Sequence, residues 1–348
     1  MTRLTPQAAR AVRLLSRPVL NLRDQQEIQQ LRLMPQDWPA IVLRAYTHRW
    51  TGWLLAHARQ LTLPLPAESL QQLEAFSLTD IRRTMELDQL LRQLQPLWDR
   101  PLPPVLLLKG RGIERRAYPP GILRPIVDID LLVRPGHDAE LADFLRSLQM
   151  LPTWTSRAGH VTMWSAPEGP VVEVHTRPLD PWRFAPMMHP RTVERWFTHA
   201  VQAEGRLEPD PLDQTAFLLV HLLEGVYCDT RHLGDLLQWL RVVQPEPREV
   251  LDRLRQWQAL RAGLTGLQVV LADEPELHAK WAPLLTNLPL DVQALLARET
   301  RRLAEHHHQQ RIGDLPRWLE GAGLGLHLDQ PVRWALSWTP LKTWMDWQ

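Results

Sequence analysis

Two pairs of polar residues in this chain have a spacing that suits metal chemistry. Asp128 and Asp130 lie two apart inside an apolar segment, and Glu173 and His175 have the same spacing on another candidate strand. Because side chains alternate between the two faces of a strand, both members of each pair would point to one face. Three carboxylates that converge from two strands repel one another and are costly to bury unless a divalent cation neutralises them. Oxygen ligands favour Mg²⁺ or Mn²⁺, so we predict a site for one of these ions with Asp128, Asp130 and Glu173 as ligands.

A third motif, Lys109-Gly110, ends the apolar run 105–108 and precedes a segment that we expect to be a short helix. Exposed N–H groups at such a strand-to-helix turn can bind phosphate, and glycine lets a ligand approach the backbone closely. Only three of the 40 basic residues are lysine, and the compact ammonium of Lys109 suits phosphate as a point charge. Arg124, just before the acidic segment, could add a bidentate phosphate contact or be a solvated loop arginine. We therefore assign Lys109, Gly110 and Arg124 to a predicted phosphate-binding set.

Apolar patterns place these motifs in a small unit of strands and helices between two helical regions. In the first hundred residues, apolar side chains recur at helical spacing, among them Ile81, Met85, Leu91, Leu94 and Trp98. The proline-rich segment 101–104 is typical of a short stiff linker. Short strands and a hairpin follow, and helices return beyond about residue 190, one of them with an Asp210-Pro211 start and Gly225 as its C-terminal cap.

The predicted fold class is therefore α+β, with a small mixed β-sheet core and helical regions on both sides. The expected segments are a helical N-terminal region over 1–100, an α/β core over 101–180 and a helical C-terminal domain over 181–348. A cleft between the sheet and the C-terminal helices would hold the ligands.

Composition excludes several classes of protein. The formal net charge of +1 makes no case for a dedicated nucleic-acid binder, which usually carries a basic surplus. A single cysteine, Cys228, excludes an intramolecular disulfide framework and multi-cysteine metal sites, and we expect an inert thiol there. We see no export signal and no apolar stretch of the ~20 residues that would span a bilayer, so we expect a cytoplasmic protein. Most of the 16 tryptophans are expected in the core or in contacts between segments.

Taken together, the motifs resemble a known family. They are Leu-Leu-Leu-Lys-Gly at 106–110, Tyr-Pro at 118–119, Leu-Arg-Pro at 123–125, Asp-Ile-Asp-Leu-Leu-Val at 128–133 and Val-Glu-Val-His at 172–175. This order is similar to that of the uncharacterised nucleotidyltransferase family in the DNA polymerase beta-like superfamily. The helical run that ends at Trp98, and His221, Arg231 and Asp235 on later helices, also look like the flanking pattern of that family. The resemblance covers about residues 35 to 240.

The resemblance implies a metal-dependent transfer of a nucleoside monophosphate from a nucleoside triphosphate, ATP among the possible donors. It implies Asp128 and Asp130 as metal ligands and Glu173 as the third carboxylate. The wider superfamily carries a Gly-Ser pair at the first turn, whereas this chain has Lys109-Gly110 and no serine there. The expected acceptor is a protein, a peptide or a small molecule, and the balanced charge argues against a long nucleic-acid duplex.

Four further residues are assigned to the site or to its support. His175 shares a strand face with Glu173 and could orient it, contact substrate or carry a proton, so we include it in the catalytic set. His221 and Asp235 could form a buried histidine–carboxylate bond that fastens the helical domain. Alternatively, they could line the site together with Arg231.

Two other functions are consistent with the motifs. A metal-dependent glycosyltransferase also uses Asp-x-Asp, but it would need a nucleotide-binding βαβ stretch where this chain has about a hundred helical residues. A catalytically degenerate protein of the same fold would bind a nucleotide or a partner without transfer, and the missing serine favours that reading.

Overall fold

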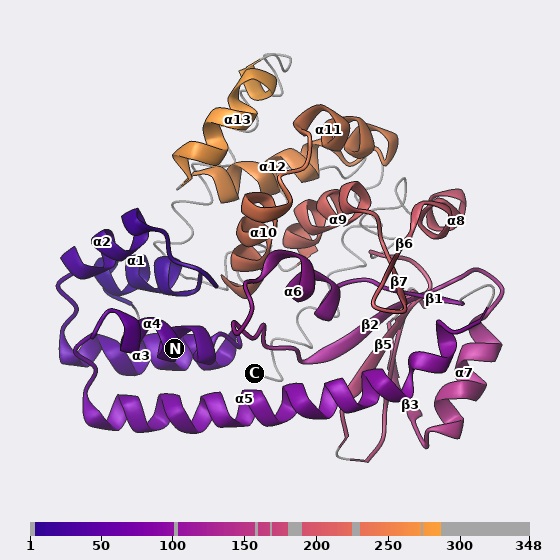
Figure 1. Ribbon diagram of the computed structural model, residues 1–348, viewed down its shortest axis with the longest axis horizontal. Helices are drawn as coiled ribbons and strands as arrows, with labels where there is room; N and C mark the ends of the chain where they lie inside the picture. The colour runs from indigo at the N-terminus through magenta and orange to yellow at the C-terminus, as the bar shows by residue number, and fades with distance from the viewer. Residues whose placement is uncertain are drawn as a thin grey trace, which may run out of the picture.

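The computed structural model describes residues 4–100, 104–156, 159–167, 169–179, 190–224, 230–272 and 274–286. Within these ranges the chain forms a five-stranded mixed sheet and a two-stranded hairpin with helices on both sides, which confirms the predicted α+β fold class (Figure 1). Gly225, Cys228, the linker residues 101–103 and all residues after 286 lie outside the described residues, so the predictions made for them are not tested.

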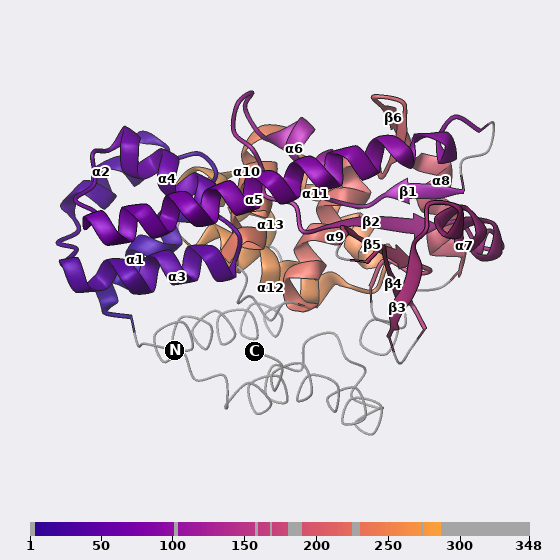
Figure 2. The ribbon, with the colours of Figure 1, turned by 90° about the horizontal axis from the view of Figure 1, so that it is seen from below.

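The N-terminal region is helical, as predicted. Its helices are α1 (Pro6–Leu15), α2 (Leu22–Gln30), α3 (Trp38–Thr47), α4 (Thr51–Gln60) and α5 (Ala67–Gln93). Polar side chains define where the first two begin: Thr5 accepts a hydrogen bond from the N–H of Ala8, and Asn21 forms a capping box with Asp24. Helix α5 is the longest described helix and runs from the α1–α4 group to the sheet (Figure 2).

The buried face of α5 differs from the one expected from its apolar residues. Ile81 and Met85 are 42% and 65% exposed. The middle of the buried face is polar, because Asp80 accepts hydrogen bonds from Thr51 Oγ1 at 2.6 Å and from Arg49 at 3.2 Å. A buried carboxylate with two donors is stable there, so the helix turns its apolar side chains at 81 and 85 outward.

The sheet has the strand order β1-β2-β5-β4-β3. Its strands are β1 (Val105–Leu107), β2 (Asp128–Val133), β3 (Leu151–Thr155), β4 (Val161–Ser165) and β5 (Val171–His175). Strands β2 and β5 are parallel, and the other neighbours are antiparallel, including the β4–β5 hairpin that the sequence predicts. Helix α6 (Arg111–Ala117) connects β1 to β2, and α7 (Asp138–Ser147) follows β2. The motif-bearing strands therefore lie side by side at the centre of the sheet.

The C-terminal part is mostly helical. It contains α8 (Pro190–His199), α9 (Pro211–Glu224), α10 (Thr230–Val243), α11 (Pro247–Gln256), α12 (Leu260–Leu271) and α13 (Pro275–Thr286). The predicted start of α9 is confirmed, since Asp210 Oδ1 accepts from the N–H groups of Leu212 and Asp213. The hairpin of β6 (Val201–Ala203) and β7 (Arg206–Glu208) was not expected. None of the helices in the described ranges combines the length and the apolar character that a bilayer span requires.

Helices cover the sheet from two sides. Helix α5 lies below β2 in Figure 1, and α6 and α9 lie above it. Buried hydrophobic residues from all three sequence segments form one cluster, and five tryptophans are among its most deeply buried side chains: Trp38, Trp50, Trp196, Trp239 and Trp281. The prediction that tryptophans belong to the core is confirmed for these five.

One buried ion pair connects the C-terminal helices to the loop that enters β2. Arg124 donates from Nε and Nη2 to the two oxygens of Asp235 on α10, at 2.9 and 2.7 Å, and the hydroxyl of Tyr118 donates to the same carboxylate. Burial opposes the ionised form of Asp235, but the Arg124 charge outweighs it and lowers the pKa of that carboxyl. Gln238, one turn further along α10, donates to the carbonyl of Ala117 at 2.7 Å. The segment between α6 and β2 is thus held against α10 at both of its ends.

Replacing Asp235 with asparagine is expected to lower the free energy of unfolding by about 3–5 kcal/mol, because the guanidinium of Arg124 stays buried without its counter-charge. The matched control is Asp252→Asn, which removes an exposed pair with Arg255 on α11 and should cost less than about 1 kcal/mol. Urea unfolding of both variants measures the difference. Equal destabilisation by the two would show that the buried pair does not hold this loop.

Candidate functional site

The sheet brings the predicted acidic residues together. Asp130 on β2 and Glu173 on β5 are paired in the parallel register. His175 Nε2 lies 3.2 Å from Asp130 Oδ1 and 3.5 Å from Glu173 Oε2. In the described part of the chain, ligand atoms of Asp130, Glu173 and His175 lie within 4.8 Å of one another. The group close enough to share one ion therefore includes His175, while Asp128 lies two residues earlier on the same strand face and is partly buried.

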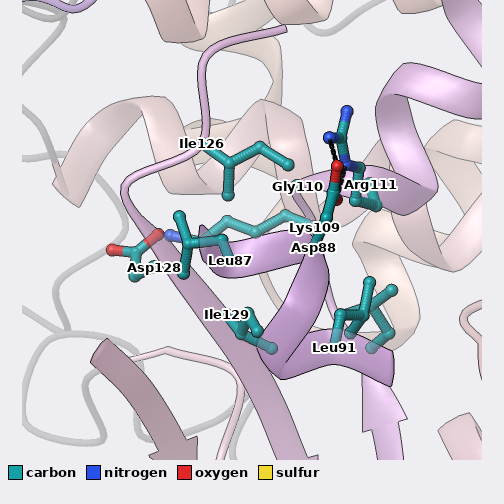
Figure 3. Close-up of a pocket in the computed structure, with 10 residues that line it drawn as sticks. Leu87, Asp88, Leu91, Lys109, Gly110, Arg111, Ile126, Asp128 and Ile129 are labelled. Atoms are coloured by element: carbon teal, nitrogen blue, oxygen red, sulfur yellow. Dashed lines mark hydrogen bonds and ion pairs between the residues drawn. The ribbon is translucent and has the colours of Figure 1, made fainter. Parts of the chain in front are cut away.

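Lys109 points its ammonium into this acidic cluster. The N–H of Leu108 donates to the carbonyl of Asp130 at 3.0 Å, so the residue after β1 enters the turn next to the acidic strand. Lys109 Nζ lies 3.1 Å from Asp130 Oδ1 and 3.5 Å from Nε2 of His221. Its aliphatic stem extends toward Asp128 past Leu87 and Ile126 (Figure 3). The resident partner of this lysine is a carboxylate, and its predicted contact with phosphate stays a prediction.

Gly110 provides the backbone turn between β1 and α6. Its φ of 69° and ψ of −114° form a conformation that residues with a Cβ rarely adopt. A Cβ built on it would come no closer than 3.8 Å to Ile126, so the backbone angle rather than space requires glycine here. The next residue, Arg111, is held by Asp88 of α5, with Nε 2.6 Å from Oδ1. A small pocket lies at this turn, lined by Leu87, Asp88, Leu91, Leu107, Lys109, Gly110, Arg111, Ile126, Asp128 and Ile129.

Helices α9 and α10 bring three basic side chains to the site. His221 of α9 contacts Lys109, and its ring centre lies 4.9 Å from that of His232 on α10. Arg231 Nη2 lies 3.2 Å from His232 Nε2, and the positive charge of Arg231 acts on Asp128. The sequence reasoning missed His232, although it lies next to Arg231 at the start of a predicted helix. The guanidinium of Arg231 and two imidazoles from α9 and α10 thus lie close to the negative groups of two strands.

Arg124 and Asp235 differ from the expectations for them. Arg124 is only 3% exposed, so its interpretation as a solvated loop arginine is wrong, and its guanidinium is engaged by Asp235. Asp235 does fasten the helical part to the core, but through Arg124 and Tyr118. The sequence missed this role of Tyr118, since nothing in the spacing of 118, 124 and 235 shows that the three side chains meet.

Crowding of charges shifts the pKa values of the cluster. Burial raises the pKa of Asp128 to about 7, and repulsion from Asp130 adds to this effect. Burial acts in the same direction on Asp130, but Lys109 and His175 outweigh it and hold the pKa of that carboxyl far below its usual value. Burial disfavours the imidazolium of His175, yet its bonds to Asp130 and Glu173 raise its pKa to about 9.

The two groups that meet at α9 shift in opposite directions. Burial opposes the charge of Lys109, but the carboxylates of Asp130, Asp128 and Glu173 overcome it and raise the pKa of the ammonium. Burial lowers the pKa of His221 well below its usual value, and the charge of Lys109 adds to this shift. Near neutral pH the cluster therefore has an ionised Asp130, a cationic Lys109 and His175, and a neutral His221.

In EDTA, Asp128 and His175 are expected to lower the free energy of unfolding as pH rises from about 5 to about 9, while the buried neutral His221 acts in the opposite direction below about pH 6.5. The pKa of Asp128 near 7 and that of His175 near 9 both exceed the unfolded values, so these two groups bind more protons in the folded state than in the unfolded state in this window. The contribution of His175 is complete below about pH 6.5 and is lost as pH rises toward 9.

The substitution Asp128→Asn removes the contribution of Asp128 to this pH dependence. The variant should therefore gain stability over the wild type between about pH 5 and 7, and the gain should level off at about 1–3 kcal/mol. Urea unfolding at several pH values measures it. A gain that does not change with pH would contradict the raised pKa of Asp128.

A family model described as an uncharacterised nucleotidyltransferase matches residues 34–271 of the chain. The matched range includes α5, the sheet and α10, and it contains every candidate site residue named above. No curated protein matches the chain.

Proposed function

Because the chain belongs to the uncharacterised nucleotidyltransferase family, we propose that it transfers a nucleoside monophosphate from a nucleoside triphosphate to a hydroxyl group of an acceptor, with Mg²⁺ or Mn²⁺ as the cofactor. The observation that carries this proposal is the acidic cluster on β2 and β5, faced by basic side chains of α9 and α10. Phosphoryl transfer needs this combination, since it depends mainly on positioning and on neutralising charge.

The donor set of the cluster fits a divalent cation. Ligand atoms of Asp130, Glu173 and His175 lie close enough to share one ion, and Asp128 adds a carboxylate on the same strand face, whose pKa is raised by burial and by the neighbouring Asp130. Asp128, Asp130 and Glu173 would hold the ion through oxygen atoms, which Mg²⁺ and Mn²⁺ prefer. Such an ion, when bound, neutralises phosphate charge and polarises the phosphoryl group.

The reaction forms a bond between the acceptor oxygen and the α-phosphorus, and it breaks the bond from that phosphorus to the bridging oxygen of the leaving pyrophosphate. Glu173 is the carboxylate that takes the acceptor proton, since its side chain is 23% exposed while that of Asp130 is 1% exposed and is bonded to Lys109 and His175. His175 orients both carboxylates through its Nε2. Lys109, Arg231 and His232 bind the phosphates, and Gly110 shapes the turn that brings Lys109 to them.

The acceptor class that we propose is inferred from the charge of the chain. The chain has a formal net charge of +1, so it has no surplus of positive charge for a long duplex. A protein, a peptide or a small molecule with a free hydroxyl is the acceptor that this balance favours.

The substitution Asp128→Asn should reduce nucleotide transfer at least about a hundredfold, because it removes a ligand charge from the metal site. Because we expect this variant to be more stable than the wild type, unfolding would not account for its loss of transfer activity. The assay incubates the protein with Mg²⁺, a cell extract and each nucleoside triphosphate labelled at the α-phosphate, and measures label on any acceptor.

The matched control is Asp143→Asn, which alters an exposed carboxylate on α7 that pairs with Arg146 and should leave transfer unchanged. Equal labelling by the wild type and the Asp128 variant would rule out the proposed site. Nucleotide binding by the wild type without any labelled acceptor would favour the degenerate binding protein.

A further inference from the structure

We propose that Lys109 is a built-in counter-ion of the acidic cluster, which competes with the metal ion for Asp130 and releases that carboxylate when nucleotide phosphates bind the ammonium. Metal and nucleotide would then bind cooperatively through one side chain. This inference rests on the proposed function of the site and adds to it the order in which the charges are exchanged.

The first step of the argument is that Asp130 is already engaged. Lys109 Nζ at 3.1 Å and His175 Nε2 at 3.2 Å both contact the same oxygen, Oδ1. The side chain of Asp130 is 1% exposed, so it has almost no access to water. A cation that binds Oδ1 must displace one of these nitrogens, and it must also overcome the repulsion of a second positive charge next to Lys109.

The second step concerns where the ammonium can go. The stem of Lys109 lies beside Leu87 and Ile126, and the side chain is 13% exposed (Figure 3). Lys109 Nζ also lies 3.5 Å from Nε2 of His221, which belongs to the basic side of the site together with Arg231 and His232. Movement away from Asp130 brings the ammonium toward these groups, and a bound polyphosphate is what makes that position favourable.

The third step explains why this position holds a lysine in a chain in which only three of the 40 basic residues are lysine. An arginine binds a carboxylate through two parallel hydrogen bonds, as Arg124 does with Asp235. The two parallel hydrogen bonds fix the orientation of both groups. An ammonium on a flexible stem has no fixed orientation and can exchange a carboxylate for a phosphate with little rearrangement. The lysine therefore suits a group that changes partner during the binding cycle.

Thermodynamic linkage makes the consequence measurable. If phosphates remove Lys109 from Asp130, nucleotide raises the affinity for the metal, and the metal raises the affinity for nucleotide by the same factor. Removal of the ammonium should then increase metal affinity without nucleotide and reduce the enhancement by nucleotide.

The test measures Mn²⁺ binding by titration calorimetry and by electron paramagnetic resonance, with and without a saturating α,β-methylene nucleoside triphosphate. In the absence of nucleotide, Lys109→Met should bind Mn²⁺ at least about tenfold more tightly than the wild type, and the analogue should enhance its affinity at least about tenfold less. Lys109→Arg keeps the charge and should bind Mn²⁺ weakly both with and without the analogue. The control, Lys280→Met, removes a lysine that donates to the carbonyl of Gln244 away from the site and should match the wild type.

The outcomes separate the two proposals. If the wild type and Lys109→Met bind Mn²⁺ equally without nucleotide, or if Lys109→Arg behaves as the wild type does, the counter-ion role is wrong while the proposed transfer stands. If neither the wild type nor any variant binds the analogue with Mn²⁺, the proposed function itself fails. If Lys109→Met unfolds in EDTA, recovery of its circular dichroism signal by Mn²⁺ at concentrations that do not stabilise the wild type supports the proposal, and failure to recover overturns it.

Discussion

The structure of the site depends on one electrostatic constraint: carboxylates of Asp128, Asp130 and Glu173 share one face of adjacent strands. The parallel register of β2 and β5 pairs Asp130 with Glu173, so the backbone hydrogen bonds of the sheet impose the proximity. Like charges held together raise one another's pKa unless cations are supplied. His175 supplies one from the same sheet, and Lys109 supplies another from the turn after β1. Burial and the neighbouring Asp130 raise the pKa of Asp128, and the charges of Lys109 and Arg231 offset this effect only in part.

The guanidinium of Arg124 and the ammonium of Lys109 have different roles in this region because they bind carboxylates differently. Arg124 forms a bidentate pair with Asp235, deep in the interior, and fixes the approach to β2 against α10. Its guanidinium is therefore part of the support of the site rather than of its phosphate-binding surface. Lys109 makes a single contact to Asp130 from a flexible stem. A fixed cation and an exchangeable cation thus lie on the two segments that flank α6, one for architecture and one for ligand binding.

The sequence predicted the local features that depend on short-range patterns. The α+β fold class, the β4–β5 hairpin and the start of α9 follow from alternation and capping residues. The pairing of Arg124 with Asp235 could not be predicted, because it joins residues 111 positions apart and depends on how α10 packs. Charge pairing also explains the outward turn of Ile81 and Met85, since a carboxylate at Asp80 with two donors displaces the apolar face that periodicity indicates. His232 was missed because a single histidine next to an arginine carries no periodic signal.

The helices on both sides of the sheet form one structural unit with it and contribute side chains to the candidate site. The strands are short, and the sheet can bury its faces only against helices that come from before and after it in the chain. Helix α5 lines the turn at Lys109 through Leu87 and Leu91, while α9 and α10 provide His221 and Arg231 on the other side. The family match runs from residue 34 to residue 271 and therefore includes α3–α5 before the sheet and α8–α12 after it. Arg17 of the first region also bonds Glu274 just before α13 at 2.8 Å, so the flanking helices contact each other directly. A nucleotide held between the acidic strands and the basic helices would thus depend on all three segments of the chain.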